Sequence, residues 1–294
     1  MDGIGRLTLS CRHLRSPARF GHEFRGRAGI SESGGMSDFA LPNCDHDLTG
    51  QVAIVTGATS GLGHRFARVL AAAGAQVVAT GRRVERLDSL VDVIRDEGGE
   101  AVGVELDMTD TESILACVQQ AEEAYGTVSI LINNAGIPDA QRAHKMPVDL
   151  IDRVIDTNLR GPYVLSCEVA RRLIERKMHG RMVNVSSVAA YHYDGHGAAL
   201  YSITKAGIAR MTEALAVEWS RFHINVNGIA PGAFRSEMLE GMMERMGGDF
   251  APGMPRKRLG EPAQLDSTLL YLCSPSSECV TGTVIKVDDG QGPR

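Results

Sequence analysis

A tyrosine and a lysine stand four residues apart in the segment YSITK, at Tyr201 and Lys205. Residues at this spacing share one face of a helix, so the two side chains meet if the segment is helical. A free tyrosine has a pKa of about 10 and is a poor acid–base catalyst at neutral pH. Because a nearby ammonium favours the phenolate, Lys205 would bring Tyr201 toward the pH at which general acid–base catalysis is efficient.

Two more polar residues extend this pair into a set. Ser187 follows an expected strand at 182–186, shortly before Tyr201, and Asn158 lies upstream in a long helical pattern. A tyrosine and a lysine at this spacing are common on helix surfaces, so the pair alone is a weak signal. The complete and ordered set of four is specific.

A glycine-rich segment, TGATSGLG at 56–63, joins a β-branched run to a helical pattern. Gly57 permits a sharp turn, Gly61 lets the backbone approach a pyrophosphate, and Gly63 allows close packing of helix on strand. The helix N-terminus adds free N–H groups and a partial positive charge, which favour phosphate binding. Glycines at a strand-to-helix junction are a much stronger signal than glycines alone.

Short apolar runs alternate with helical patterns from about residue 51 onward. This alternation predicts an α/β fold, a Rossmann-like doubly wound parallel sheet of about seven strands in a single domain. The expected strands are 52–56, 76–80, 101–106, 128–133, 182–186, 224–229 and 284–287. The expected helices are 63–73, 84–97, 109–125, 150–177 (interrupted at Gly161-Pro162), 201–222 and 262–272.

The chain resembles the single-domain branch of the short-chain dehydrogenase/reductase family over about residues 47–294. The resemblance is carried, in order, by TGATSGLG (56–63), Asp107, NNAG (133–136), Asn158, Ser187, YSITK (201–205) and PG (231–232). It implies that Tyr201 exchanges a proton with the substrate oxygen and that Ser187, rather than Ser186, hydrogen-bonds that oxygen. It further implies that Lys205 binds the nicotinamide ribose and that Asn158 anchors a water that relays protons to Lys205.

The resemblance also implies a nicotinamide cofactor, with NADP(H) favoured and NAD(H) as the alternative. Gly81 stands where an NAD-binding chain would carry an acid for the ribose 2′-OH, whereas Arg82, together with Arg83, can pair with a 2′-phosphate. Ser60 stands where many NADP users carry a basic residue, which keeps NAD(H) open. The residues expected at the cofactor are Gly57, Thr59, Ser60, Gly61, Leu62, Gly63, Arg82, Arg83, Asp107, Met108, Asn133, Ala135, Gly136, Tyr201, Lys205, Pro231, Gly232 and Ser236.

Composition narrows the classes of function and partner. The net charge of −5 argues against nucleic-acid binding, and no apolar run is long enough to span a membrane. The six cysteines are scattered without a CxxC pair, which suits the cytoplasm and predicts no metal site. We expect residues 1–46 to be a disordered extension before a catalytic domain at 47–294, with a transit peptide or a true start at Met36 as alternatives for the Arg-rich leader.

The predicted function is hydride transfer between a nicotinamide cofactor and a carbonyl or secondary alcohol, as in NAD(P)-dependent dehydrogenases. The alternative is a nicotinamide-binding sensor or scaffold without turnover. Within the enzyme class, 3-oxoacyl thioester reductases and sugar-acid or polyol dehydrogenases are both similar. We further expect a homotetramer or homodimer, with helices 150–177 and 201–222 at the main interface.

Two segments are expected to cover the substrate. The loop between Ser187 and Tyr201 holds Tyr191, His192, Tyr193, Asp194 and His196, and we expect both histidines to be surface residues rather than metal ligands. The segment after Gly232 holds Phe234, Met238, Met242, Met243 and Met246. It is either an adaptable apolar lid or a helix packed on its own domain.

Overall fold

The computed structural model describes residues 42–193, 195 and 197–292. The compact unit begins at Asn43, a few residues before the expected start of the domain at residue 47. Residues 43–46 pack on this compact unit, because the Asp45 N–H donates a hydrogen bond to Ser276 Oγ at 3.1 Å. The organisation expected for residues 1–41 lies outside the described residues.

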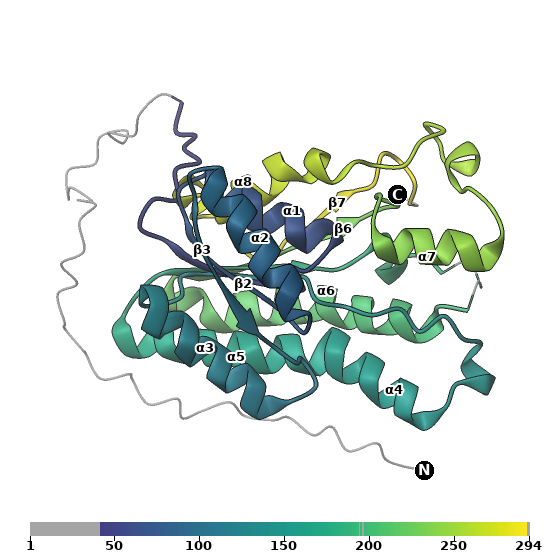
Figure 1. Ribbon diagram of the computed structural model, residues 1–294, viewed down its shortest axis with the longest axis horizontal. Helices are drawn as coiled ribbons and strands as arrows, with labels where there is room; N and C mark the ends of the chain where they lie inside the picture. Colours follow the sequence, from purple (N-terminus) through teal and green to yellow (C-terminus); the bar gives the residue numbers. More distant parts are fainter. Residues whose placement is uncertain (1–41, 194, 196, 293–294) are drawn as a thin grey trace, which may run out of the picture. The chain divides into compact units, whose positions relative to one another are not determined.

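The described chain folds into one parallel sheet with helices on both faces (Figure 1). The strands are β1 (Val52–Thr56), β2 (Gln76–Gly81), β3 (Glu100–Glu105), β4 (Ile130–Asn133), β5 (Gly180–Val185), β6 (Ile224–Pro231) and β7 (Val284–Val287). The α-helices are α1 (Gly61–Ala72), α2 (Val84–Asp96), α3 (Thr111–Tyr125), α4 (Val148–Ile155), α5 (Gly161–Arg176), α6 (Ala199–Trp219), α7 (Glu237–Met246) and α8 (Asp266–Cys273). Among the described residues, no helix is both long enough and apolar enough to cross a membrane.

The strand order is β3-β2-β1-β4-β5-β6-β7, so the direction of winding reverses between β1 and β4. One apolar cluster packs α1, α2 and α8 on one face, around the fully buried Phe66 and Leu70. A second packs α3, α5 and α6 on the other face, around Leu165 and Leu215. Burial on both faces explains why the central strands read as continuous apolar runs. The predicted α/β doubly wound fold is confirmed.

The long helix expected at 150–177 is instead α4 and α5 joined by a π-helical turn, η2 (Asp156–Arg160). Pro162 explains the change, because it has no N–H to donate to the Asn158 carbonyl and its ring would crowd that carbonyl in a regular helix. A π-turn adds one residue and widens the helix at this point. The interruption therefore falls just before Gly161-Pro162, and it contains the buried Asn158.

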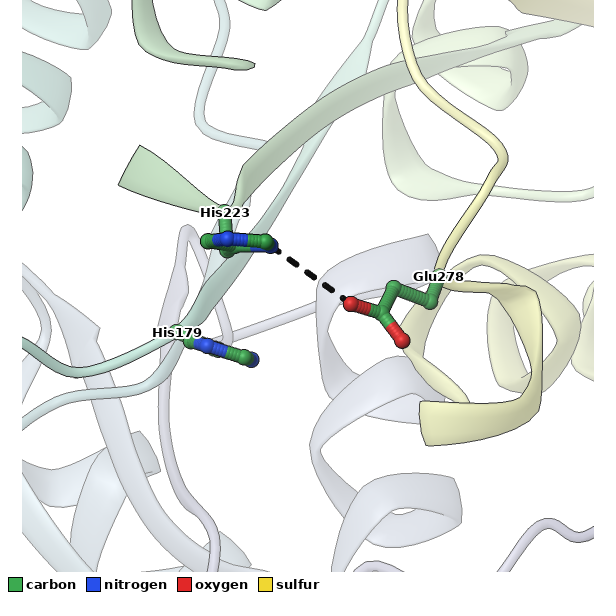
Figure 2. Close-up of side chains that lie close together, drawn as sticks. All are labelled: His179, His223 and Glu278. Carbon is green, nitrogen blue, oxygen red and sulfur yellow. Dashed lines mark ion pairs between the residues drawn. The ribbon is translucent and has the colours of Figure 1, made fainter. Parts of the chain in front are cut away.

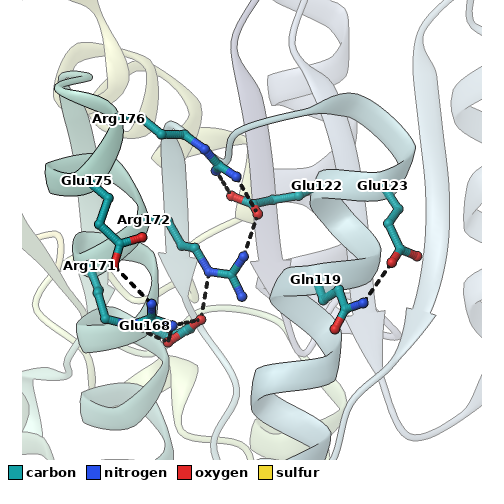
Figure 3. A network of polar contacts seen from close by, with 8 residues as sticks. All are labelled: Gln119, Glu122, Glu123, Glu168, Arg171, Arg172, Glu175 and Arg176. Atoms are coloured by element: carbon teal, nitrogen blue, oxygen red, sulfur yellow. Dashed lines mark hydrogen bonds and ion pairs between the residues drawn. The ribbon is translucent and has the colours of Figure 1, made fainter.

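A network of ion pairs joins α3 to α5 (Figure 3). Arg172 contacts Glu122 of α3 at 2.9 Å and Glu168 of its own helix at 2.8 Å, and Arg176 also pairs with Glu122. Burial opposes the charge on Glu168, yet hydrogen bonds from the two neighbouring arginines lower its pKa. The network fixes α5, the helix that continues from the Asn158 turn.

Candidate active site

The predicted site residues gather at the carboxyl ends of the strands, beside the reversal between β1 and β4. Gly57 follows β1, Asn133 ends β4, Ser187 follows β5, and Pro231 ends β6. A crevice at such a reversal is where doubly wound sheets bind their ligands. The topology thus brings to one edge of the sheet residues that are far apart in the sequence.

The glycine loop is built to admit a phosphate group. Gly57 has φ +66° and Gly61 has φ +56°, a region that side chains with a Cβ rarely adopt. A Cβ at Gly63 would collide with the Gly57 carbonyl, so only glycine permits this close packing. Ser60 precedes α1 in an extended conformation without capping it, which leaves the N-terminus of α1 available to an anion.

The loop is held in place from β4. Thr56 Oγ1 accepts hydrogen bonds from the backbone N–H groups of Asn134 and Ala135 at 2.9 and 3.0 Å. The Asn134 amide donates to the Thr56 carbonyl at 2.9 Å. The start of the glycine loop and the NNAG segment therefore form one rigid wall that fits a dinucleotide cofactor.

Of the two arginines after β2, Arg83 lies on the glycine loop. Its guanidinium donates to Thr59 Oγ1 at 2.8 Å and to Ser60 Oγ at 3.0 Å. The same group pairs with Glu237 at 3.2 Å, and Glu237 is also bound by Arg86. Hydrogen bonds from these two arginines lower the pKa of Glu237. An ion pair thus links the first residue of α7 to the glycine loop through Arg83.

The charge of Arg82 acts instead on Asp107, which follows β3. Hydrogen bonds from Thr109 lower the pKa of Asp107, and the charge of Arg82 contributes to the same shift. Met108, beside Asp107, is buried at 4% exposure in the core. At Gly81 a Cβ would lie 2.8 Å from the Thr59 side chain, so an acid at this position would require Thr59 to shift.

Tyr201, Ser187 and Lys205 meet where β5 ends and α6 begins. Ser187 lies close enough to Tyr201 to stabilise its phenolate and lower its pKa, and Lys205 Nζ lies 5.6 Å from the centre of the Tyr201 ring. Lys205 is 4% exposed and donates to the Val185 carbonyl at 2.7 Å. Ser186 instead donates to the Lys205 carbonyl at 2.8 Å, so Ser187 is the serine that is left to face Tyr201.

Burial dominates the ionisation of this pair. It raises the pKa of the Tyr201 hydroxyl, the bond from Ser187 opposes that shift, and the charge of Asp139 reinforces it. Burial also lowers the pKa of Lys205 to about 8. Both shifts favour the neutral forms of the two side chains. A further positive charge next to Tyr201 would favour its phenolate and so lower its pKa toward neutral pH.

Asn158 lies in the π-turn with 1% of its surface exposed. Its Oδ1 accepts from the Ile137 N–H at 2.8 Å, and its Nδ2 donates to the Ile137 carbonyl at 2.9 Å and to Thr204 Oγ1 at 3.3 Å. A Cβ at Gly136 would lie 3.5 Å from both Asn158 Oδ1 and Lys205 Nζ. Asn158 therefore ties the NNAG loop to α6 immediately beside Lys205.

Asn133 is buried deeper in the same edge and is hydrogen-bonded to side chains of the core. Its amide donates to Ser166 Oγ at 2.9 Å and to Asn184 Oδ1 at 2.8 Å, while its own buried Oδ1 has no hydrogen-bond partner. The amide thus joins β4 to α5 and β5. Ala135 and Gly136 follow it toward Asn158 and Lys205.

The segment after β6 borders the same edge of the sheet. A Cβ at Gly232 would lie 2.9 Å from the Asp288 backbone, so Pro231-Gly232 packs directly on the C-terminal turn. Ser236 caps α7 by accepting from the Leu239 N–H at 3.3 Å. A Cβ at Gly61 would stand 3.3 Å from Ser236 Cβ. The start of α7 therefore borders the glycine loop, and Leu62 packs against the core behind it.

In the expected substrate loop, Tyr191 lies under Lys286, whose Nζ is 4.4 Å from the ring centre. His192 is exposed and belongs to no metal-binding group among the described residues, whereas Asp194 and His196 lie outside them. Among the methionines of α7, Met238 is 38% exposed, and Met242 and Met243 are partly buried. Phe234 is buried against Gly260.

Sequence reasoning missed Asp139, which is 3% exposed. Its Oδ2 accepts from the N–H groups of Leu200 and Tyr201 at 2.9 and 3.1 Å, and its Oδ1 accepts from Ala140 at 2.8 Å. A carboxylate in this place stabilises the N-terminus of α6 and fixes the backbone of Tyr201. Nothing local in the sequence signals this role, because Leu200 and Tyr201 are distant along the chain.

Comparison with known proteins gives consistent matches. A family model described as short chain dehydrogenase matches residues 51–247. A 2-dehydro-3-deoxy-D-gluconate 5-dehydrogenase of Formosa agariphila is 33% identical over 250 residues, 83% of this chain and 93% of its own. A 3-oxoacyl-(acyl-carrier-protein) reductase of Thermotoga maritima is 35% identical over 243 residues, covering 83% and 98%. A variant of actinorhodin polyketide ketoreductase solved with NADPH superposes with a TM-score of 0.79 at 32% identity, covering 83% and 98%.

Replacing Asp139 tests its role at the start of α6. Asp139→Ala leaves three backbone N–H groups without an acceptor, so we expect the free energy of unfolding to fall by about 1–3 kcal/mol. Urea unfolding measures the change, with Asp152→Ala on the exposed side of α4 as the matched control, expected within about 0.5 kcal/mol of the parent. Equal losses in both variants would contradict the assignment.

Proposed function

The chain belongs to the short-chain dehydrogenase family, and from this premise we propose that it transfers a hydride between a nicotinamide cofactor and a carbonyl or secondary alcohol, with Tyr201 as general acid and base. The relatives reported above are oxidoreductases that act on alcohol or keto groups, and this chain is one of the same class. The observation that carries the proposal is the placement of Tyr201 beside the buried Lys205, whose Nζ lies 5.6 Å from the ring centre, with Ser187 next to both.

Each side chain of the site has a distinct task in this proposal. The bound nicotinamide supplies or accepts the hydride. Tyr201 donates its hydroxyl proton to the substrate oxygen during reduction and takes it back during oxidation. Ser187 hydrogen-bonds the same oxygen and so holds it within reach of Tyr201. The Lys205 ammonium favours the phenolate that forms when the proton leaves, because opposite charges attract strongly where water is excluded.

Asn158 acts in this proposal through position. It holds the Ile137 backbone and Thr204 of α6, so the loop that lines the crevice and the helix that carries Tyr201 keep a fixed separation. A water bound at this turn would relay protons to Lys205, which is the role that the family resemblance implies.

The alternative of a sensor without turnover is tested by the same site. We expect Tyr201→Phe to lower turnover by at least about 100-fold, because the proton of the hydroxyl is lost while the ring remains. Nicotinamide absorbance follows turnover with a panel of 3-oxoacyl thioesters, sugar acids and polyols, which also separates the two substrate classes. Nicotinamide fluorescence measures cofactor binding, which we expect to be retained.

Tyr271→Phe, on the exposed side of α8, is the matched control and is expected to leave turnover unchanged. If Tyr201→Phe keeps full turnover, the mechanism is wrong. Absence of turnover in the parent chain on the whole panel, together with tight cofactor binding, would favour the sensor.

We also propose that NADP(H) is preferred over NAD(H). Arg83 is already hydrogen-bonded to Thr59 and Ser60, where it borders the glycine loop, and Gly81 has no carboxylate to repel a 2′-phosphate. Arg82 is exposed next to Asp107 and adds positive charge to the same corner. The NADPH in the solved ketoreductase supports the same choice.

Removing the arginines tests the cofactor preference. We expect Arg83→Ala and Arg82→Ala each to weaken NADPH binding by about tenfold or more while NADH binding changes little, because a charge-assisted hydrogen bond contributes about 1.5–3 kcal/mol. Dissociation constants from fluorescence titration provide the comparison. Arg95→Ala, at the far end of α2, is the control and is expected to bind both cofactors as the parent does. Equal losses for NADPH and NADH would remove the 2′-phosphate argument.

A homotetramer or homodimer in the cytoplasm is the assembly that we propose. Tyr163 of α5 is 50% exposed, and Ile203 and Val217 of α6 are 64% and 79% exposed. A hollow of about 300 Å³ lies between the same two helices, lined in part by Tyr163 and Trp219. Exposed apolar side chains of this kind favour a protein–protein contact. The described cysteines are all free, which supports a reducing compartment.

Placing a charge in this surface tests the assembly. We expect Val217→Glu to lower the molar mass measured by light scattering, because a carboxylate buried in an apolar contact is strongly unfavourable. Val84→Glu, at an exposed position of α2, is the control and should keep the parent mass. A parent chain that is monomeric at all concentrations would contradict the proposal.

A further inference from the structure

Three potential metal ligands lie together at the end of the sheet opposite the active site (Figure 2). His179 immediately precedes β5 and His223 immediately precedes β6. Glu278 follows the short helical turn η7 (Pro275–Ser277), in the connection that leads to β7. Because β5, β6 and β7 are parallel neighbours, the segments that enter them meet at the amino ends of the strands.

The side chains of this group face one another. The two imidazole rings stack with their centres 4.6 Å apart and their planes 15° from parallel, and His223 Nδ1 lies 3.5 Å from Glu278 Oε1. One potential ligand atom from each residue falls within 4.8 Å of the other two. In a tetrahedral zinc site with bonds of about 2.0–2.2 Å, ligand atoms are about 3.3–3.6 Å apart. Near-parallel rings do not aim their nitrogens at one point, so an ion would require one imidazole to turn out of the stack, and the exposure of all three side chains leaves room for that turn.

The backbone that carries these side chains is fixed before any ion binds. The Gly180 N–H donates to the His223 carbonyl at 3.2 Å, which joins the two histidine-bearing segments. The Asn225 amide donates to the Glu278 carbonyl at 2.7 Å, which joins the third. His223 itself has φ +55°, a conformation that is uncommon for residues with a side chain and that marks a site held by its surroundings.

The electrostatics of the group also suit a metal ion. Imidazole must be neutral to bind a metal. The stacked rings cannot both carry a proton without repulsion, and the carboxylate of Glu278 adds the negative charge that a divalent cation requires.

We propose that His179, His223 and Glu278 bind a divalent transition-metal ion of the zinc class, with water in the remaining position. Two nitrogen ligands and one carboxylate suit Zn²⁺, as well as Cu²⁺ and Ni²⁺, whereas Mg²⁺ and Ca²⁺ take oxygen ligands. The bound ion joins the entries of β5, β6 and β7. It therefore stabilises the folded state without taking part in the chemistry at the opposite edge.

Zinc binding to the full chain provides the test. After dialysis against a chelator, calorimetric titration with ZnCl₂ is expected to show a site that is lost or weakened by at least about tenfold in His179→Ala and in Glu278→Gln, since even outer-shell changes cost about 10–100-fold. His144→Ala, an exposed histidine outside the group, is the matched control and should bind as the parent does. Zinc should raise the melting temperature of the parent and leave that of His179→Ala unchanged, and MgCl₂ should have no effect.

A second possible zinc site contains a cysteine, so its sulfur allows the two sites to be distinguished by spectroscopy. Cys44 Sγ lies 3.9 Å from His46 Nε2, so this pair is the alternative place for zinc. With Co²⁺ in place of Zn²⁺, the proposed site gives absorption without a thiolate charge-transfer band, and Cys44→Ser leaves the affinity unchanged. A thiolate band that disappears in Cys44→Ser, or equal zinc affinity in the parent and His179→Ala, would overturn the proposal. Turnover is a separate measurement, so neither outcome depends on the proposed reaction.

Discussion

A buried ammonium sets the geometry on which the catalytic edge of the sheet depends. Lys205 is 4% exposed, and burial of its charge is costly unless fixed dipoles compensate it. The Val185 carbonyl at the end of β5 is such a dipole, at 2.7 Å from Nζ. Ser186 then donates to the Lys205 carbonyl, so strand and helix are joined at both ends of the same residue. Tyr201, one turn earlier on α6, is held beside Ser187 as a consequence.

A second set of buried hydrogen bonds, deeper in the core, supports this edge of the sheet. Asn133 of β4 donates to Ser166 of α5 and to Asn184 of β5, and Asn184 donates to Thr212 of α6 at 3.0 Å. Buried amides of this kind are stable only when their partners are correctly placed, so they penalise a shift of either helix along the sheet. Together with Asn158 and Asp139, these buried hydrogen bonds fix the position of α6 relative to the ends of the strands, so this distance does not depend on the conformation of a loop.

The sequence was a good guide wherever the signal is local. The strands were predicted because burial on both faces gives continuous apolar runs, and Tyr201 and Lys205 were paired because their spacing is helical. Asp139 was missed because its partners are distant in sequence. That Arg83, rather than Arg82, binds the glycine loop depends on the direction of the side chains, which composition and spacing do not reveal. For the same reason no motif indicated that His179 and His223 would stack.

The π-turn at Asp156–Arg160 has a consequence for how this region can change. One extra residue rotates everything beyond it by about 100° relative to a regular helix. The side chains of α5 therefore point about 100° away from where an uninterrupted continuation of α4 would place them. A one-residue deletion here would force the ring of Pro162 against the carbonyl one turn earlier, and it would turn either Asn158 or the core face of α5 away from its partners. Both Pro162 and the position of Asn158 therefore oppose a regular helix at this point in the chain.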